Sequence, residues 1–162
     1  MANQLGFEVN AEQNEMFKGV SRKRCLNILL DIGGITASQE QFDTWMVDKN
    51  DDYLKYIDSM DESEILPDVK NILQYLKENN QPIALGSASK NAQPILEKVG
   101  LLDYFDSIVD GNHVTKAKPD PEVFLIAAKA VSITPENCIV FEDSLAGIQA
   151  ANSANMISIG IG

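Results

Sequence analysis

Three short polar segments of this sequence carry residue types that suit phosphoryl chemistry. The first is Gly86–Ser89, whose small hydroxyl side chains and backbone N–H groups could bind phosphate oxygens. The second is Thr115–Asp120, in which Lys118 could neutralise charge on the same phosphate. The third contains Glu142 and Asp143, and carboxylate oxygens are the ligands that Mg²⁺ prefers. Each segment alone is a weak signal, but the three together favour phosphoryl chemistry.

The strands expected beside these segments would bring them to one edge of a sheet. Short apolar runs predict strands at Pro82–Leu85, Ser107–Val109, Cys138–Phe141 and Met156–Ile159. Helices are predicted between and before them, at Pro67–Lys77, Asn91–Val99, Asp120–Val131 and Leu145–Asn152. Alternating strands and helices indicate an α/β fold, with a parallel sheet covered by helices on both faces. In such sheets chemistry gathers at the carboxyl ends of the strands, and Ser87 and the Glu142–Asp143 pair both follow a predicted strand.

The first sixty residues predict helices only. Helical spacing of apolar residues indicates segments at Ala11–Lys18, Ser21–Leu30 and Ser38–Met60. The last of these is either one helix or two helices broken near Lys49–Asn50. We therefore expect a helical domain over residues 1–60 and an α/β domain over residues 61–162, with the boundary in the acidic stretch Asp58–Glu64.

Composition limits the class of protein. The 162 residues include 13 Lys+Arg and 24 Asp+Glu, which gives a formal net charge of -11. This acidity argues against nucleic-acid binding, because phosphate backbones need a basic face. No apolar run approaches the roughly 18 residues of a membrane span, and the N-terminus has no signal-peptide pattern. The isolated cysteines, Cys25 and Cys138, fit a reducing cytoplasm better than a disulfide scaffold.

The polar segments, taken with their flanking residues, resemble the haloacid dehalogenase superfamily. The resemblance is carried by Gly86–Asn91, Lys118–Phe124 and Val140–Ala151. Within the superfamily the sequence is most similar to the β-phosphoglucomutase group, because Phe17–Arg22 and Lys49–Asp51 also resemble that group's helical cap. The resemblance implies a three-layer, Rossmann-like core with a parallel sheet, together with a small all-helical cap domain.

The resemblance also implies roles for individual residues. Ser87 matches the hydroxyl that hydrogen-bonds the transferring phosphoryl group, and Lys118 matches the lysine that bridges this group and the nucleophile. Asp143 matches a direct Mg²⁺ ligand, with Glu142 beside it. Arg22 matches a cap arginine that grips a second, non-reacting phosphate. Further sugar-phosphate contacts are implied at Lys18, Lys49, Ala88, Ser89, Lys90 and Asn91.

Lys18 and His113 both have interpretations that involve no contact with substrate. Lys18 could equally pair with a nearby acidic side chain instead of contacting substrate. His113, the only histidine, lies in an expected loop and is assigned no role.

One element of the family pattern is absent from this sequence. The family's nucleophilic aspartate lies in a D-x-D-G type motif at the end of a first strand, and no such motif occurs here. Asp31–Gly34 is a superficial candidate, but it ends an expected helix. We expect the family's first strand to precede Met1 and its sheet to continue beyond Gly162. Without that strand, Pro82–Leu85 and Cys138–Phe141 should have unpaired edges. This predicts a chain that is marginally stable, aggregation-prone, or closed by direct pairing of the two strands.

The resemblance implies a β-phosphoglucomutase-like phosphotransferase that interconverts β-glucose 1-phosphate and glucose 6-phosphate through a phospho-aspartate. The basic cap residues favour a mutase, because only a bisphosphate intermediate needs a second phosphate grip. Two alternatives stay open: a sugar-phosphate phosphatase of the same fold, and a catalytically inactive fragment, since the chain as given lacks the nucleophile. We expect a small sugar phosphate as partner, Mg²⁺ as cofactor, and a monomer for the complete enzyme.

Overall fold

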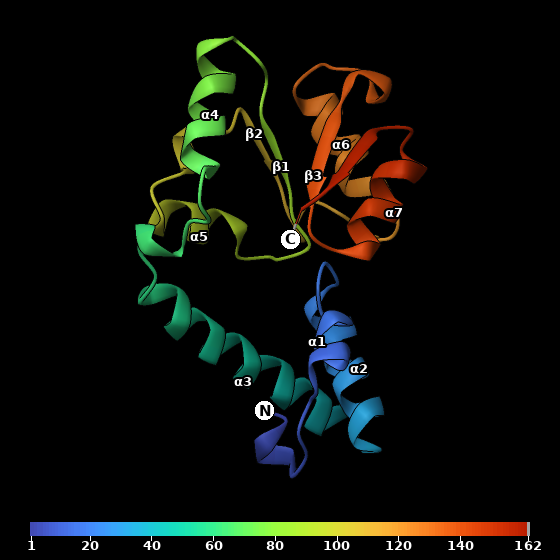
Figure 1. Ribbon diagram of the computed structural model, residues 1–162. Helices are drawn as coiled ribbons and strands as arrows, with labels where there is room; N and C mark the ends of the chain where they lie inside the picture. Colours follow the sequence, from blue (N-terminus) through green and yellow to red (C-terminus); the bar gives the residue numbers. More distant parts are fainter. Residues whose placement is uncertain (162) are drawn as a thin grey trace.

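The computed structural model describes residues 1–161, which form a helical part and an α/β part (Figure 1). The helical part contains a 3-10 turn η1 (Asn3–Leu5) and helices α1 (Ala11–Glu15), α2 (Arg22–Gly33) and α3 (Gln39–Asp58). The helices of the α/β part are α4 (Val69–Glu78), α5 (Ala92–Lys98), α6 (Glu122–Ala130) and α7 (Leu145–Ser153). Its strands are β1 (Ala84–Gly86), β2 (Ser107–Val109), β3 (Ile139–Glu142) and β4 (Ile157–Gly160), and its 3-10 turns are η2 (Glu62–Glu64), η3 (Leu102–Tyr104) and η4 (Pro135–Asn137). Every predicted helix and strand of the sequence is therefore confirmed, with ends shifted by a few residues.

Side-chain caps fix where the helices of the helical part begin. Ser21 caps α2, because its hydroxyl accepts a hydrogen bond from the Arg24 N–H at 3.3 Å. Ser38 and Gln41 form a reciprocal capping box at the start of α3. From this cap α3 runs for 20 residues without a break, so the alternative of two shorter helices is wrong. Helix α1 is shorter than predicted, since it ends at Glu15 and a turn follows.

The four strands form two separate parallel pairs. In the first pair Leu85 of β1 lies opposite Ile108 of β2, and in the second Phe141 of β3 lies opposite Ile159 of β4. Within residues 1–161, β1 and β3 are not hydrogen-bonded to each other. Direct pairing of these two strands, one of the outcomes expected from the sequence, therefore does not occur.

Helices cover the two strand pairs unequally. The β1–β2 pair has both faces covered, by α6 on one side and by α4 and α5 on the other. The β3–β4 pair packs against α7 on one face only. Its other face presents large apolar side chains that are 40–55% exposed: Ile139, Phe141, Ile157 and Ile159. For this pair the expectation of helices on both faces is wrong within the described residues.

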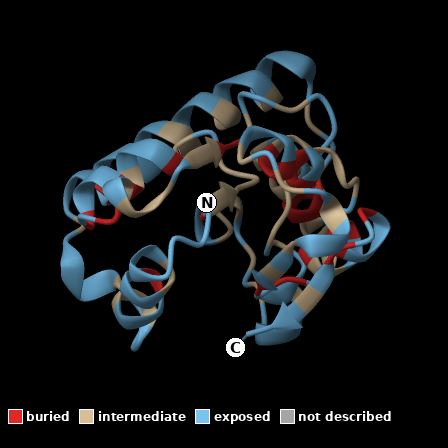
Figure 2. Cartoon of the chain, turned by 90° about the horizontal axis from the view of Figure 1, so that it is seen from above, coloured by how far each residue is buried: buried red, intermediate tan, exposed pale blue. Residues whose placement is uncertain are grey.

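Apolar side chains gather in three clusters that respect the predicted domain division. One cluster centres on Leu26, Leu29 and Leu30 and draws all its members from residues 1–46. The other two take all their members from residues 60–156. The outer surfaces of the helices are exposed, as Figure 2 shows. These separate cores support a helical domain and an α/β domain, while their exact boundary stays a prediction.

The composition led to expectations about membrane-spanning helices and about disulfide bonds. Among residues 1–161, no helix combines the length and the apolar character that crossing a membrane requires. Cys25 and Cys138 both carry free thiols.

Candidate active site

Lys118 connects the carboxyl ends of the two strand pairs. Its ammonium donates hydrogen bonds to the Gly86 carbonyl at 3.1 Å and to Glu142 Oε2 at 2.7 Å. It also lies 4.6 Å from the centre of the Phe124 ring. The Lys118 side chain is only 5% exposed. Because an ammonium has three N–H groups, one donor remains for another acceptor at this edge.

Glu142 ends β3 and is fully engaged by the protein. Its Oε2 accepts from Lys118, and its Oε1 accepts from the Ser144 hydroxyl at 2.6 Å and the Ser144 N–H at 3.1 Å. Burial by itself raises the pKa of Glu142, but the hydrogen bonds from Lys118 and Ser144 outweigh it. The pKa therefore lies below its usual value, and Glu142 is the ionised partner of Lys118.

Ser144 is a site residue that the sequence analysis missed. Its hydroxyl donates to Glu142 and accepts from the Gly147 N–H at 3.0 Å, so that it also caps α7. A side chain at Gly147 would overlap the Glu142 carboxylate. The sequence signal was a serine at the start of a predicted helix, directly after the acidic pair.

Ser87 lies beside Lys118, because it follows Gly86, whose carbonyl Lys118 binds. The Ser87 N–H donates to the Val109 carbonyl at 2.8 Å, which extends the pairing of β1 and β2. Its hydroxyl accepts from the Ser89 N–H at 3.1 Å, and the Ser89 hydroxyl accepts from the Asn91 N–H at 3.0 Å. The predicted site residues Ser87 and Lys118 are thus brought together, at the end of β1.

The segment Ser87–Asn91 also reaches the helical part. The Asn91 side-chain amide donates to Asn50 Oδ1 of α3 at 3.4 Å. Lys98 of α5 adds an ion pair with Asp58 at 3.1 Å. Of the remaining predicted contacts, Ala88 is half-buried and Lys90 is exposed. Helix α3 therefore lies against the start and the end of α5.

Lys18 faces the α/β part across an open pocket of about 330 Å³. The pocket is lined by Lys18 and Val20 on one side and by Asp143, Ser144 and Gln149 on the other. Lys18 pairs with Glu15 at 2.9 Å, and this carboxylate raises the pKa of Lys18, with a smaller contribution from Asp143. The structure therefore supports both interpretations of Lys18, as an ion-pair partner and as a residue of the site.

Arg22 and Lys49 are half-buried within the helical part. Burial raises the pKa of Tyr53, and the Arg22 charge opposes this effect. Burial likewise raises the pKa of Cys25, and the Lys49 charge opposes it. The charges of Arg22 and Lys49 therefore each lower the pKa of a neighbouring side chain of the helical part. Neither makes an ion pair within residues 1–161, so both charges are available for a phosphate.

The carboxylates at this edge offer few ligands for a metal ion. No group of three or more His, Cys, Asp or Glu side chains among residues 1–161 is arranged to hold a metal. Both oxygens of Glu142 are occupied by protein donors, whereas Asp143 is exposed. Mg²⁺ is commonly held by one or two carboxylates together with water and substrate phosphate. The residues present therefore fit Mg²⁺ only through Asp143, with the other ligands coming from outside this set.

Asp31, the superficial candidate for a nucleophile, lies in the last turn of α2. It is exposed and belongs to the helical part, which contains no strand among the described residues. Asp31 therefore does not occupy the strand-end position of the family's nucleophile.

Gly19 allows the helical part to approach the start of α7. Its backbone is left-handed, with φ of +68°, and a Cβ here would overlap the Ser144 side chain. Gly34 offers a matched comparison, because it has φ of +62° but open space around its Cβ position.

We expect Gly34→Ala to lower the free energy of unfolding by about 1–2 kcal/mol, from backbone strain alone. Gly19→Ala should cost about 1–3 kcal/mol more, because the added methyl also meets Ser144. Urea denaturation of both variants measures the difference. Equal losses would show that Gly19 does not pack against Ser144 in solution.

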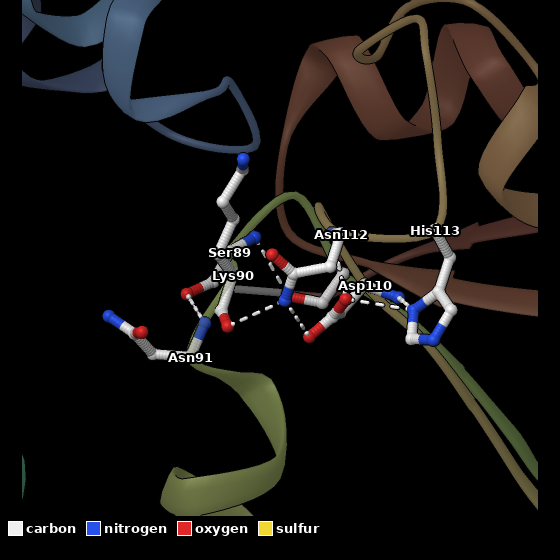
Figure 3. A network of polar contacts seen from close by, with 7 residues as sticks. Ser89, Lys90, Asn91, Asp110, Asn112 and His113 are labelled. Carbon is white, nitrogen blue, oxygen red and sulfur yellow. Dashed lines mark hydrogen bonds and ion pairs between the residues drawn. The ribbon is translucent and has the colours of Figure 1, made fainter.

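A further polar cluster follows β2, where the sequence analysis assigned no role. Asp110 is buried there, and His113 Nδ1 lies 2.8 Å from Asp110 Oδ1 (Figure 3). His113 is thus the partner of a buried carboxylate and not an isolated loop residue. The signal in the sequence was Asp110–His113 itself, a polar run directly after a predicted strand.

Comparison with known proteins gives consistent matches over this chain. Residues 3–155 match the family model described as haloacid dehalogenase-like hydrolase. The chain is 37% identical to the β-phosphoglucomutase of Bacillus subtilis, over all of this chain and 73% of that protein. It is 36% identical over 102 residues to a fructose-1-phosphate phosphatase of Escherichia coli, covering 63% of this chain and 54% of that one. The crystal structure of a β-phosphoglucomutase from Clostridium difficile superposes with a TM-score of 0.92 at 40% identity, covering 99% of this chain and 73% of that one.

Proposed function

Because this chain belongs to the haloacid dehalogenase-like hydrolase family, we propose that its site handles a phosphorylated sugar in the manner of a β-phosphoglucomutase. The reaction proposed is the interconversion of β-glucose 1-phosphate and glucose 6-phosphate through a phospho-aspartate. The observation that carries the proposal is the position of Lys118, buried between the carboxyl ends of β1 and β3 and beside Ser87. A buried cation next to a hydroxyl is suited to a phosphoryl group, because the charge of the cation is little screened there.

Each proposed role follows from the chemistry of the side chain. The Ser87 hydroxyl donates a hydrogen bond to a phosphoryl oxygen. Its own oxygen accepts from the Ser89 N–H, which leaves the O–H for this bond. Lys118 uses its third N–H for the phosphoryl group, while Glu142 keeps the ammonium in place. Asp143 holds Mg²⁺, which when bound would neutralise phosphoryl charge. We assign the nucleophilic aspartate to none of the residues that the structure describes.

The helical part is proposed to bind the rest of the substrate. Arg22 takes the second phosphate of a bisphosphate intermediate, because a guanidinium binds phosphate in a bidentate manner. Lys18, which lines the pocket between the two parts, and Lys49 of α3 add positive charge for the substrate. Ala88, Ser89, Lys90 and Asn91 contact the sugar phosphate from the α/β part.

A sugar-phosphate phosphatase of the same fold is the second candidate. The match to a fructose-1-phosphate phosphatase supports it, and that match covers only part of this chain. The two candidates differ in their need for a second phosphate grip. A mutase must hold a bisphosphate intermediate while the intermediate reorients between two phosphoryl transfers, whereas a phosphatase transfers one phosphoryl group to water.

Arg22→Ala tests the proposed function through binding by isothermal titration calorimetry in the presence of Mg²⁺. We expect this variant to bind β-glucose 1,6-bisphosphate about 10- to 100-fold more weakly than the unmodified chain, which corresponds to one lost charge-assisted contact. Arg24→Ala is the control, because Arg24 is exposed on the same helix and has no assigned role. Its affinity should be unchanged.

The other outcomes separate the candidates. Equal affinity of the unmodified chain for glucose 6-phosphate and the bisphosphate, with no effect of Arg22→Ala, would favour the phosphatase. Absence of binding to any sugar phosphate would contradict the proposal.

A further inference from the structure

The loop that follows β2 contains a buried carboxylate with several fixed partners (Figure 3). The Asp110 side chain is 6% exposed. Its Oδ1 accepts from the Asn112 N–H at 2.8 Å, and its Oδ2 accepts from the Asn112 side-chain amide at 3.2 Å. Asn112 is therefore bound to one carboxylate through both its backbone and its side chain, although it lies on the surface.

The same Asn112 amide also bonds the neighbouring loop. Its Nδ2 donates to the Lys90 carbonyl at 3.1 Å. The amide nitrogen has two N–H groups, and Asp110 and Lys90 account for both. Because Asp110 is buried and fixed, the orientation of the Asn112 amide is fixed too. Asn112 thus joins the end of β2 to the segment that follows β1.

The backbones of the two loops are in direct contact at this point. The Gly111 N–H donates to the Ser89 carbonyl at 3.0 Å. A Cβ at Gly111 would lie 2.9 Å from the Ala88 carbonyl oxygen and 3.0 Å from Lys90 Cγ, so a side chain there would push the loops apart. The bond from Asn112 to Lys90 therefore acts on a segment already held at Ser89.

His113, whose own side chain is exposed, also contacts Asp110. Its Nδ1 accepts from the Asp110 N–H at 3.1 Å and lies 2.8 Å from Asp110 Oδ1. Nδ1 can accept from the amide only without a proton and can donate to the carboxylate only with one. Asp110 has a His113 partner in either protonation state.

We infer that Asn112, oriented by Asp110, is a positioning residue for the sugar-phosphate-binding segment Ser89–Asn91. The inference rests on the proposed function, which gives this segment its ligand. In Figure 3 the Lys90 ammonium points away from the Asp110 network, so the network holds the backbone of Lys90 and leaves its charge free. A segment held in its binding conformation loses less conformational entropy when the ligand binds. Asn112 therefore contributes to sugar-phosphate affinity without touching the ligand.

Asn112→Ala tests the inference with two ligands. Glucose 6-phosphate reaches Ser89–Asn91, whereas inorganic phosphate needs only Ser87 and Lys118. We expect the dissociation constant for glucose 6-phosphate to rise about three- to tenfold, which corresponds to one neutral hydrogen bond. The dissociation constant for inorganic phosphate should not change. Asn137→Ala is the control, because Asn137 is exposed, lies before the start of β3, and its side chain makes a single local hydrogen bond, to Thr134.

Amide hydrogen exchange gives a readout that needs no ligand. Exchange of the Asn91 N–H, which bonds the Ser89 hydroxyl, should be faster in Asn112→Ala than in the unmodified chain. Asn112→Asp should behave like Asn112→Ala or worse, because it keeps the size but loses the donor and faces Asp110 with a second carboxylate.

The outcomes distinguish this inference from the proposed function. Unchanged exchange at Asn91 in Asn112→Ala would overturn the inference, and so would equal weakening of both ligands, which would indicate a general structural role. If the unmodified chain binds phosphate but no sugar phosphate, the proposed function fails, while the exchange measurement still decides whether Asn112 positions the segment.

Discussion

Lys118→Met should lower the free energy of unfolding by about 3–5 kcal/mol, because it leaves the buried Glu142 carboxylate without its charge partner. The Lys118 and Glu142 side chains are 5% and 8% exposed, so solvent screens the carboxylate only weakly. The same change removes the contact to the Gly86 carbonyl, which joins β1 to the β3 side of the molecule. Urea denaturation followed by circular dichroism measures the loss.

The double variant Lys118→Met with Glu142→Gln separates charge from packing. It removes both charges together, so we expect it to be more stable than Lys118→Met alone. A double variant as unstable as the single one would show that the destabilisation comes from packing and not from the unpaired carboxylate.

The pair also predicts how stability depends on pH. The pKa of Glu142 is lowered in the folded chain from its ordinary value of 4.5, despite the opposing effect of burial. Its contribution to stability is therefore complete above about pH 4.5 and is lost as the pH falls through the lower, folded-state pKa. Glu142→Gln should lack this part of the acid dependence. An unchanged acid profile in Glu142→Gln would contradict the assignment of a lowered pKa.

Leu26→Ala should lower the free energy of unfolding of the helical part by about 3–5 kcal/mol. Leu26 is completely buried at the centre of the apolar cluster formed by residues of the helical part. The two apolar clusters of the α/β part share no residue with the cluster around Leu26, so the loss of stability should be confined to the helical part. Hydrogen exchange should show lost protection over residues 11–58 and retained protection in the strands.

Leu54→Ala is the matched control for this experiment. Leu54 lies on α3 but is 39% exposed, so its truncation should cost much less. Simultaneous loss of protection in both parts of Leu26→Ala would show that the chain unfolds as one unit, and the predicted division at residue 60 would then be wrong.

Much of the site could be predicted because the signals are local. A strand such as Ser107–Val109 can be recognised from its own apolar residues, and the polar residue that follows it must lie at its carboxyl end. Ser87 follows such a strand and lies at its carboxyl end in the structure. Asp110 has the same local signal, because it directly follows Ser107–Val109.

The partners of these residues could not be predicted, because they are distant in the sequence. Lys118 lies 32 residues from Gly86 and 24 residues from Glu142, and it contacts both. Glu142 was predicted to bind Mg²⁺ together with Asp143, but the Lys118 ammonium and the Ser144 hydroxyl and N–H occupy its oxygens, so this prediction is wrong for Glu142. Which of several acceptors a buried donor takes depends on packing, and packing has no local signature.

The sequence by itself determined the order of helices and strands and the polar residues at the strand ends. The spacing of apolar residues and the helix caps that define these elements each involve only neighbouring residues in the chain. Only the tertiary structure decided that α3 is continuous, that the strands form two separate pairs, and that Asn112 bonds the loop after β1. These features depend on which surfaces are buried together. That choice minimises unpaired buried polar groups across the whole fold, and no short segment of the chain contains it.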